Sequence, residues 1–203
     1  MELIKLYTGP LEINTYLLIS KNKALVIDPG GDEQKICDAA KSKNACIEKV
    51  LLTHGHFDHI GAVSALQKMG AQIFIGAEDA EMLESNTKNL GKYFGMPVET
   101  CSADVFLYGG EEILLGDEKI TVIATPGHSK GGMCYLTDLG VFTGDTLFCS
   151  SIGRTDFPHS NFDTLINSIK QKLFVLEKST RVFPGHEIET TIENEIKFNP
   201  LVR

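Results

Sequence analysis

The stretch Thr53-His54-Gly55-His56-Phe57-Asp58-His59 places four side chains that can bind a metal ion close together in the sequence. It directly follows Val50-Leu51-Leu52, an apolar run that predicts a buried strand. Imidazole and carboxylate are ligands that zinc and iron prefer, and residues two apart in an extended segment face the same way. We therefore expect His54 and His56 to bind one ion together, while Asp58 and His59, beyond the next bend, can serve a neighbouring ion. The chain has 6 histidines, and three of them in one hexapeptide argue against an ordinary surface loop.

Three later segments repeat this arrangement of a strand followed by a potential ligand. A turn formed by proline and glycine would fix the direction of a histidine that follows it, and Pro-Gly-His occurs after two separate predicted strands. That recurrence makes both histidines predicted ligands. An aspartate after a third strand is a weaker signal, although its carboxylate could bridge two ions with one oxygen on each. The segments are Thr125-Pro126-Gly127-His128, Phe183-Pro184-Gly185-His186 and Phe142-Thr143-Gly144-Asp145-Thr146.

The remaining sequence predicts two blocks of strands, each with its own helices. The first block has strands at Leu3–Leu6, Thr15–Ile19, Ala24–Asp28, Val50–Leu52 and Gln72–Gly76, with helices at Glu33–Lys43 (capped by Asp32), at Ile60–Met69 and from Glu78–Leu83. The second has strands at Val105–Leu107, Ile113–Leu115, Lys119–Ala124, Met133–Thr137, Gly140–Phe142 and Arg181–Phe183, with helices at Asp163–Leu173 and Thr190–Phe198. This pattern predicts an α/β protein in which two sheets pack face to face with helices outside. Because no repeat or linker interrupts the chain, we expect residues 1–203 to form a single domain.

Composition narrows the classes of partner. The net charge is −8, and no run of lysine or arginine is present, so nucleic acid is not expected to bind. No signal peptide or apolar run of membrane-spanning length is apparent, so no membrane partner is expected.

The odd number of widely spaced cysteines predicts reduced thiols in a cytoplasmic protein. They are Cys37, Cys46, Cys101, Cys134 and Cys149, of which Cys134 and Cys149 flank the ligand segments. The sequence predicts no particular oligomeric state.

The order of the seven potential ligands resembles the metallo-β-lactamase superfamily along essentially the whole chain. The resemblance implies a four-layered αββα sandwich of two mixed β-sheets flanked by helices, with the metals at one edge of the sheets. It also implies that His54, His56 and His128 hold one metal, that Asp58, His59 and His186 hold the other, and that Asp145 bridges them. Two divalent ions are expected; zinc is favoured, with iron and manganese as alternatives, because this ligand set suits all three.

Within that superfamily, the sequence resembles the short glyoxalase II-like, or hydroxyacylglutathione hydrolase-like, branch. The resemblance rests on Gly144–Phe148, Ile152–Pro158, Thr190-Thr191-Ile192 and Asn199-Pro200-Leu201. It implies that two ions about 3.5–4 Å apart share a water, lower its pKa and produce a hydroxide that attacks a carbonyl carbon. The substrate would be a small-molecule thioester, or a related ester or lactone. Asp58, the predicted catalytic residue, either acts only as a ligand or also orients the hydroxide and carries its proton.

The substrate-binding segment departs from the longer enzymes of that branch. Arg154 matches their basic residue that contacts glutathione, and is the predicted substrate-binding residue, but Asp156 stands where they have tyrosine. A negative charge there should disfavour an anionic tripeptide. Their C-terminal helical extension also supplies basic residues, whereas this sequence ends at Arg203, so glutathione is an expectation from the resemblance alone. His159 stands where glycine is usual, and is either a surface histidine, which we favour, or a substrate contact.

An alternative function belongs to a different reaction class. The persulfide dioxygenases are near relatives that also carry a Gly-Arg-Thr-Asp-Phe stretch, here Gly153–Phe157. Such an enzyme would hold a single iron on His54, His128 and Asp145. A count of the metal ions per chain, together with an oxygen-uptake assay, separates the two functions.

Overall fold

The computed structural model describes residues 1–202, and its first sheet contains six strands in the order β1-β2-β3-β4-β5-β6. Strand β2 runs antiparallel to both β1 and β3, whereas β3, β4, β5 and β6 run parallel to one another. The strands are β1 (Glu2–Thr8), β2 (Ile13–Ser20), β3 (Lys23–Ile27), β4 (Cys46–Leu51), β5 (Gln72–Gly76) and β6 (Val105–Leu107). This sheet is therefore mixed, as the resemblance implies.

The second sheet also has six strands, in the order β14-β13-β10-β9-β8-β7. Strands β10 and β13 are parallel, and the other pairs are antiparallel. The strands are β7 (Glu112–Leu115), β8 (Glu118–Ala124), β9 (Met133–Thr137), β10 (Gly140–Gly144), β13 (Arg181–Pro184) and β14 (Thr190–Thr191), and a separate hairpin joins β11 (Leu147–Phe148) to β12 (Ser151–Ile152). Both large sheets are thus mixed.

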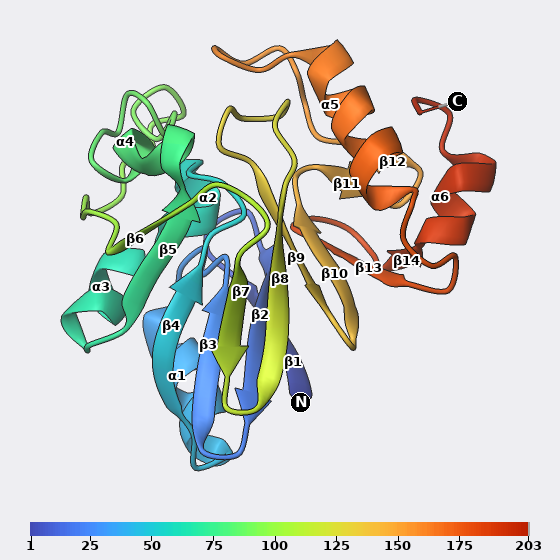
Figure 1. Ribbon diagram of the computed structural model, residues 1–203. Helices are drawn as coiled ribbons and strands as arrows, with labels where there is room; N and C mark the ends of the chain where they lie inside the picture. Colours follow the sequence, from blue (N-terminus) through green and yellow to red (C-terminus); the bar gives the residue numbers. More distant parts are fainter. Residues whose placement is uncertain (203) are drawn as a thin grey trace.

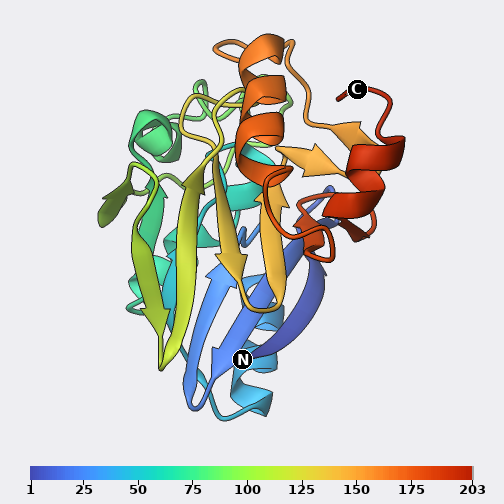
Figure 2. The ribbon, with the colours of Figure 1, turned by 45° about the vertical axis from the view of Figure 1, so that its right-hand side comes forward.

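Helices cover the outer face of each sheet (Figures 1 and 2). The helices on the first sheet are α1 (Glu33–Ser42), α3 (Val63–Lys68) and α4 (Ala80–Leu83). The short helix α2 (Phe57–Ile60) precedes α3, and the 3-10 helix η1 (Ala77–Asp79) precedes α4. On the second lie α5 (Phe162–Ser168), its π-helical continuation η2 (Ile169–Leu173) and α6 (Ile192–Phe198). The predicted four-layered αββα sandwich is confirmed. Within residues 1–202, no helix has the length and hydropathy of a membrane span.

The two sheets bury a shared apolar core between them. Tyr16 of β2 contacts the rings of Phe142 and Phe183, whose centroids lie 5.0 Å and 5.7 Å from its own. Phe142 and Phe183 come from the parallel neighbours β10 and β13 and stack at 4.7 Å. Aromatic pairs of this kind stabilise a core beyond the area they bury. This core fixes the separation of the sheets just below the ends of the strands that carry the predicted ligands.

The predicted helix Ile60–Met69 is confirmed over Val63–Lys68 (α3), but Ile60 belongs to the separate short helix α2, and the chain breaks at Gly61-Ala62 between them. A β-carbon at Gly61 would lie 2.2 Å from the carbonyl oxygen of Gly30, so the chain passes directly against the turn after β3. Ala62 then donates its amide to the carbonyl of Pro29 at 2.9 Å. These long-range backbone contacts separate the two helices. Asp58 and His59 therefore lie on the short helix α2, apart from α3.

Three smaller predictions differ from the structure in part. Strand Val105–Leu107 belongs to the first sheet, where it pairs with β5, since three residues carry too little pattern to indicate a sheet. Asp32 occupies the N-cap position of α1 without capping it, because its side chain accepts the amide of Gly9 instead. The predicted helix Thr190–Phe198 begins at Ile192, because the two threonines before it pair with β13.

Candidate metal centre

The seven predicted ligands meet at one edge of the sandwich. They lie on the segments that follow β4, β8, β10 and β13, which come from both sheets. Their donor atoms form overlapping groups in which all atoms lie within 4.8 Å of one another. These groups are His54, His56 and His128; His54, His59 and Asp145; and Asp58, His59 and His186. The structure therefore brings together every residue that the sequence predicted as a ligand.

Hydrogen bonds fix which nitrogen of three imidazoles faces the centre. The Nδ1 of His59 lies 2.9 Å from the carboxylate of Asp28, and that of His128 lies 2.8 Å from the carbonyl of Arg154. Both partners are acceptors, so each Nδ1 donates, and in the neutral ring each Nε2 carries a lone pair. The Nδ1 of His54 lies 3.1 Å from the hydroxyl of Thr53, which already donates its proton to Asp28. His54 Nε2 is thereby also left as an electron-pair donor.

Asp28, at the end of β3, supports the ligand loop, and sequence reasoning missed it. It is buried, and its carboxylate accepts the amide of Thr53 at 2.8 Å, the hydroxyl of Thr53 at 2.6 Å and the ring of His59 at 2.9 Å. Carboxylates that accept the second N–H of a metal-binding histidine fix its tautomer and raise its basicity. The sequence does carry a signal for this role, because Asp28 is another acidic residue at the end of a predicted strand and is followed by Pro29-Gly30.

Asp145 lies between the two outer groups of ligands. Its Oδ2 is 3.5 Å from His128 Nε2, whereas its Oδ1 is 3.3 Å from His59 Nε2 and 3.8 Å from His186 Nε2. The Nε2 of His186 also lies 3.2 Å from the Oδ2 of Asp58. One oxygen of Asp145 thus faces each group, which is the geometry that a bridging carboxylate needs.

Burial and neighbouring charges set the protonation of the cluster. Burial, together with adjacent imidazoles, lowers the pKa of His56 to about 3 and that of His54 well below its usual value. Burial opposes ionisation of Asp58 and Asp145, but the neighbouring imidazoles, that of His59 first, together outweigh it and hold the pKa of each carboxyl below its usual value. For His59 burial is again the largest effect, and the surrounding carboxylates overcome it and raise its pKa well above the usual value. His54 and His56 thus offer neutral imidazoles, and Asp58 and Asp145 offer ionised carboxylates.

This donor set fits divalent cations. His54 Nε2, His59 Nε2 and Asp145 Oδ1 are buried and have no hydrogen-bond partner among the described residues, although buried polar groups normally have one. His56 Nδ1 and His128 Nε2 lie 3.0 Å apart, close to the roughly 3.3 Å that separates two nitrogens on one tetrahedral zinc. The carboxylates of Asp28, Asp58 and Asp145 also gather negative charge in a buried region, which a cation would balance.

The loop that carries His186 is held by the opposite sheet. Asn14 and Tyr16 of β2 both donate to the carbonyl of Pro184, at 2.9 Å and 2.8 Å. Gly185 leaves no room for a side chain, because a β-carbon there would lie 2.6 Å from the ring of His59 and 2.9 Å from Asp145. The predicted Pro-Gly turn is therefore also a point of close packing against other ligands.

Arg154, the predicted substrate-binding residue, lies at the rim of the cavity above the cluster. Its guanidinium makes two hydrogen bonds to the carboxylate of Asp156, at 2.9 Å and 2.7 Å, and lies 4.3 Å above the ring of Phe157. Phe157 in turn contacts the ring of His56 at 5.4 Å. The side chain of Arg154 is thus already paired, while its carbonyl orients His128.

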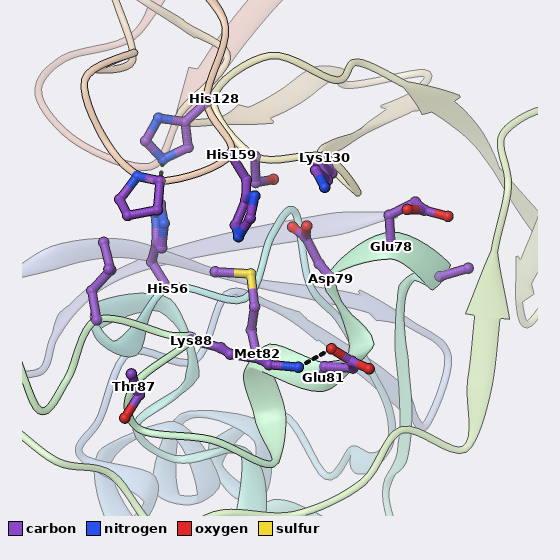
Figure 3. Close-up of a pocket in the computed structure, with 14 residues that line it drawn as sticks. His56, Glu78, Asp79, Glu81, Met82, Thr87, Lys88, His128, Lys130 and His159 are labelled. Atoms are coloured by element: carbon purple, nitrogen blue, oxygen red, sulfur yellow. Dashed lines mark hydrogen bonds and ion pairs between the residues drawn. The ribbon is translucent and has the colours of Figure 1, made fainter.

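A second cavity of about 600 Å³ lies beside His56 and His128 (Figure 3). His159 lies on its lining and is exposed, with a positive φ of 71°. Asp79 also belongs to this lining, and its buried carboxylate accepts the amide of Gly131 at 2.7 Å, which ties the loop of His128 to η1. No contact places His159 among the donor groups above.

The two cysteines that flank the ligand segments are not among those donor groups either. Cys134 is buried, lies 3.2 Å from the hydroxyl of Thr125 and has a pKa that burial raises to about 11. Cys149 is half-buried. Cys134 is therefore a protonated thiol of the core at neutral pH.

Comparisons with known proteins agree with this geometry. The family model described as the metallo-beta-lactamase superfamily matches residues 8–186. The hydroxyacylglutathione hydrolase GloC of Haemophilus influenzae is 34% identical over 191 residues, which are 90% of this chain and 88% of that protein. The matched residues of the family model include all seven side chains of the cluster.

Two solved structures extend the similarity to three dimensions. The BLEG-1 B3 metallo-beta-lactamase superposes with a TM-score of 0.93 at 33% identity, covering 99% of each chain. TTHA1623, solved in a di-iron-bound form, superposes with a TM-score of 0.86 at 32% identity, covering 97% of this chain and 98% of that one. Both cover nearly every residue, so the similarity includes the strand ends and loops that carry the cluster.

Proposed function

The chain belongs to the metallo-beta-lactamase superfamily, and from this premise we propose that it is a hydrolase of thioesters of the hydroxyacylglutathione type, or of related esters or lactones. The family supports a metal-dependent hydrolase in general terms. The observation that carries the finer proposal is the set of seven donor side chains in two groups that share Asp145. GloC, a hydroxyacylglutathione hydrolase, adds support for the thioester.

We infer that two divalent ions bind here. His54, His56 and His128 would hold one, Asp58, His59 and His186 the other, with Asp145 shared between them. Zinc is favoured and iron or manganese are alternatives, and the di-iron form of TTHA1623 supports a pair of ions. When bound, such a pair lowers the pKa of a shared water and polarises a carbonyl oxygen.

The residues of this chain have their own tasks in the proposed reaction. Asp58 is ionised and points its Oδ2 toward His59 and His186, so it can act as a ligand and can also accept the proton of the attacking water. Asp28 and the carbonyl of Arg154 hold His59 and His128 with their Nε2 lone pairs facing inward. Phe157 meets the ring of His56 edge-on at 5.4 Å and so places an apolar side chain beside this ligand.

The proposal is tested by elemental analysis of natively expressed protein, paired with hydrolysis assays on a panel of thioesters, esters and lactones that includes S-lactoylglutathione. We expect two ions per chain, and thiol release that a chelator abolishes and that added metal restores. His56→Ala should lose metal and activity, whereas His159→Ala, a matched histidine outside the donor groups, should keep both. A β-lactam belongs in the panel because BLEG-1 is a metallo-beta-lactamase. If the metal-loaded protein hydrolysed no thioester, ester or lactone, the proposal would be abandoned.

The mononuclear iron persulfide dioxygenase is the second candidate. It would use His54, His128 and Asp145, and it would leave Asp58, His59 and His186 without a task, although their donor atoms form a compact group. This second group favours the hydrolase. One iron per chain with oxygen uptake on glutathione persulfide would decide for the dioxygenase, and two ions with no oxygen uptake would remove it.

A further inference from the structure

The cavity directly above the donor groups has mostly apolar walls. Its volume is about 730 Å³, which is within the range of pockets that enclose a drug-sized ligand. His56, Asp58, His128, Asp145 and His186 line its inner side, so any molecule in it lies against the proposed metal centre. The walls are formed by Tyr7, Leu11, Phe57, Leu90, Phe94, Met96, Phe148 and Phe157.

Several of these apolar side chains are exposed at the mouth of the cavity. Phe94 is 41% exposed, Met96 39% and Leu11 46%. The rings form a connected wall, because Phe94 stacks on Phe57 with centroids 5.4 Å apart and meets Phe157 edge-on at 6.2 Å. Exposed apolar side chains that gather around a reactive centre are typical of a surface that a ligand covers.

The charged side chains around this cavity do not suit an anionic substrate. Apart from the proposed ligands, the charged residues of the lining are Glu12, Arg154 and Glu187. The cation of Arg154 is neutralised by its two hydrogen bonds to Asp156. The carboxylates of Glu12 and Glu187 are exposed, and neither forms an ion pair with another described residue. The rim is therefore negative as well as apolar.

We propose that the preferred substrates are thioesters that join an apolar acyl chain to an uncharged thiol, and that anionic glutathione thioesters are poor substrates. This rests on the proposed thioester hydrolysis. The reaction breaks the carbonyl C–S bond, forms a C–O bond to the water oxygen, and releases the carboxylate, the thiol and one proton. The acyl chain lies along the wall that contains Phe94, and the thiol leaves past the negative rim.

A set of four substrates tests the two parts of this proposal separately. Acetyl and octanoyl groups are each joined to N-acetylcysteamine, which is uncharged, and to glutathione, which is anionic. Octanoyl has six methylenes more than acetyl, and at about twofold in kcat/KM for each partly buried methylene it should exceed acetyl by about 60-fold on the same thiol. For one acyl group, N-acetylcysteamine should exceed glutathione by about fivefold at low salt, and added salt should reduce this difference.

Two variants with matched controls assign these effects to residues. Phe94→Ala should reduce the octanoyl advantage about tenfold, whereas Phe198→Ala, an exposed ring on α6, should not change it. Asp156→Asn frees Arg154 and should raise kcat/KM for glutathione thioesters about fivefold without changing the N-acetylcysteamine values. Asp117→Asn removes an exposed carboxylate that is also ion-paired, and should change neither.

A binding measurement separates the cavity from the chemistry. The octyl thioether of N-acetylcysteamine lacks the carbonyl, so calorimetry should show it binding to chelator-treated protein about tenfold more tightly than to the Phe94→Ala variant. Equal rates on acetyl and octanoyl thioesters would overturn the acyl part of the proposal, and a preference for glutathione would overturn the thiol part. Absence of hydrolysis on all four thioesters, with the thioether still bound, would instead count against the proposed function.

Discussion

Replacing Asp28 by asparagine should weaken metal binding at a residue that is not itself a ligand. The side chain keeps its size, but one oxygen becomes an NH2 group. In the structure Oδ1 accepts the amide of Thr53, while Oδ2 accepts both the hydroxyl of Thr53 and the ring of His59. An asparagine cannot satisfy all three donors. If its NH2 faces His59, the imidazole must accept at Nδ1 and carry its proton on Nε2, which then cannot bind a cation.

The size of the effect follows from these contacts. Loss of the carboxylate that supports a metal-binding histidine typically costs 10- to 100-fold in metal affinity, and we expect about that loss for the group of Asp58, His59 and His186. The first group should change less, because Asp28 reaches His54 only through the hydroxyl of Thr53. In the metal-free protein, a buried donor left without an acceptor should lower the free energy of unfolding by about 1–3 kcal/mol.

Competition between the protein and a chelator of known affinity, read by elemental analysis, gives the stoichiometry and both metal affinities. Urea unfolding of the chelator-treated protein gives the stability. The control is Asp38→Asn, the same substitution at an exposed position on α1. It should leave the stoichiometry, the metal affinities and the stability unchanged. Two ions bound by Asp28→Asn with unchanged affinities would refute the reasoning that Asp28 sets the tautomer of His59.

Three further variants or conditions probe the same centre. His128→Ala should reduce the metal content to about one ion per chain, because the group of His54, His56 and His128 loses a donor while that of Asp58, His59 and His186 stays complete, and retention of two ions would contradict this assignment. Gly185→Ala should lower thiol release at least 10-fold, since its β-carbon would lie 2.6 Å from the ring of His59, whereas Gly70→Ala, where nothing lies within 4 Å, should cost only the strain of its positive φ. Removal of metal should make stability pH-dependent. The pKa of His59 is raised well above 6.5 in the fold, so its contribution is complete below that pH and is lost as pH rises through the folded value. The urea midpoint of chelator-treated protein should therefore fall above neutral pH, and an unchanged midpoint would exclude a proton on His59.

The ligands could be predicted from sequence because each lies directly after a strand, where local pattern is informative. The apolar run before Thr53 and the repeated Pro-Gly-His turns needed no knowledge of the partner sheet. The four-layered fold followed from the resemblance that these residues carry. The break at Gly61 could not be predicted, because its cause is the carbonyl of Gly30, a contact between segments far apart in the sequence.

The same physical reason separates the donors from the residues that support them. Asp28 lies 31 residues from His59 in the sequence, and Tyr16 lies 168 residues from Pro184, so each interaction depends on sheet pairing that no single segment encodes. The apolar wall is another example. Phe57, Phe94 and Phe157 come from three separate segments, and none of them is distinguished from an ordinary core residue by its neighbours in the chain.

The order of strands in the second sheet explains why Asp145, and neither neighbouring ligand, takes the shared position. His186 follows β13, Asp145 follows β10 and His128 follows β8, and the sheet order is β13-β10-β9-β8. The strand of Asp145 therefore lies between the strands of the two Pro-Gly-His turns. Because an aspartate offers two oxygens on a short side chain, it can face both histidines from that place, at 3.8 Å and 3.5 Å. A histidine there would present one donor atom to the centre, so the two groups would lose their common ligand. Two nearly identical turns thus serve different groups because of the strand that separates them.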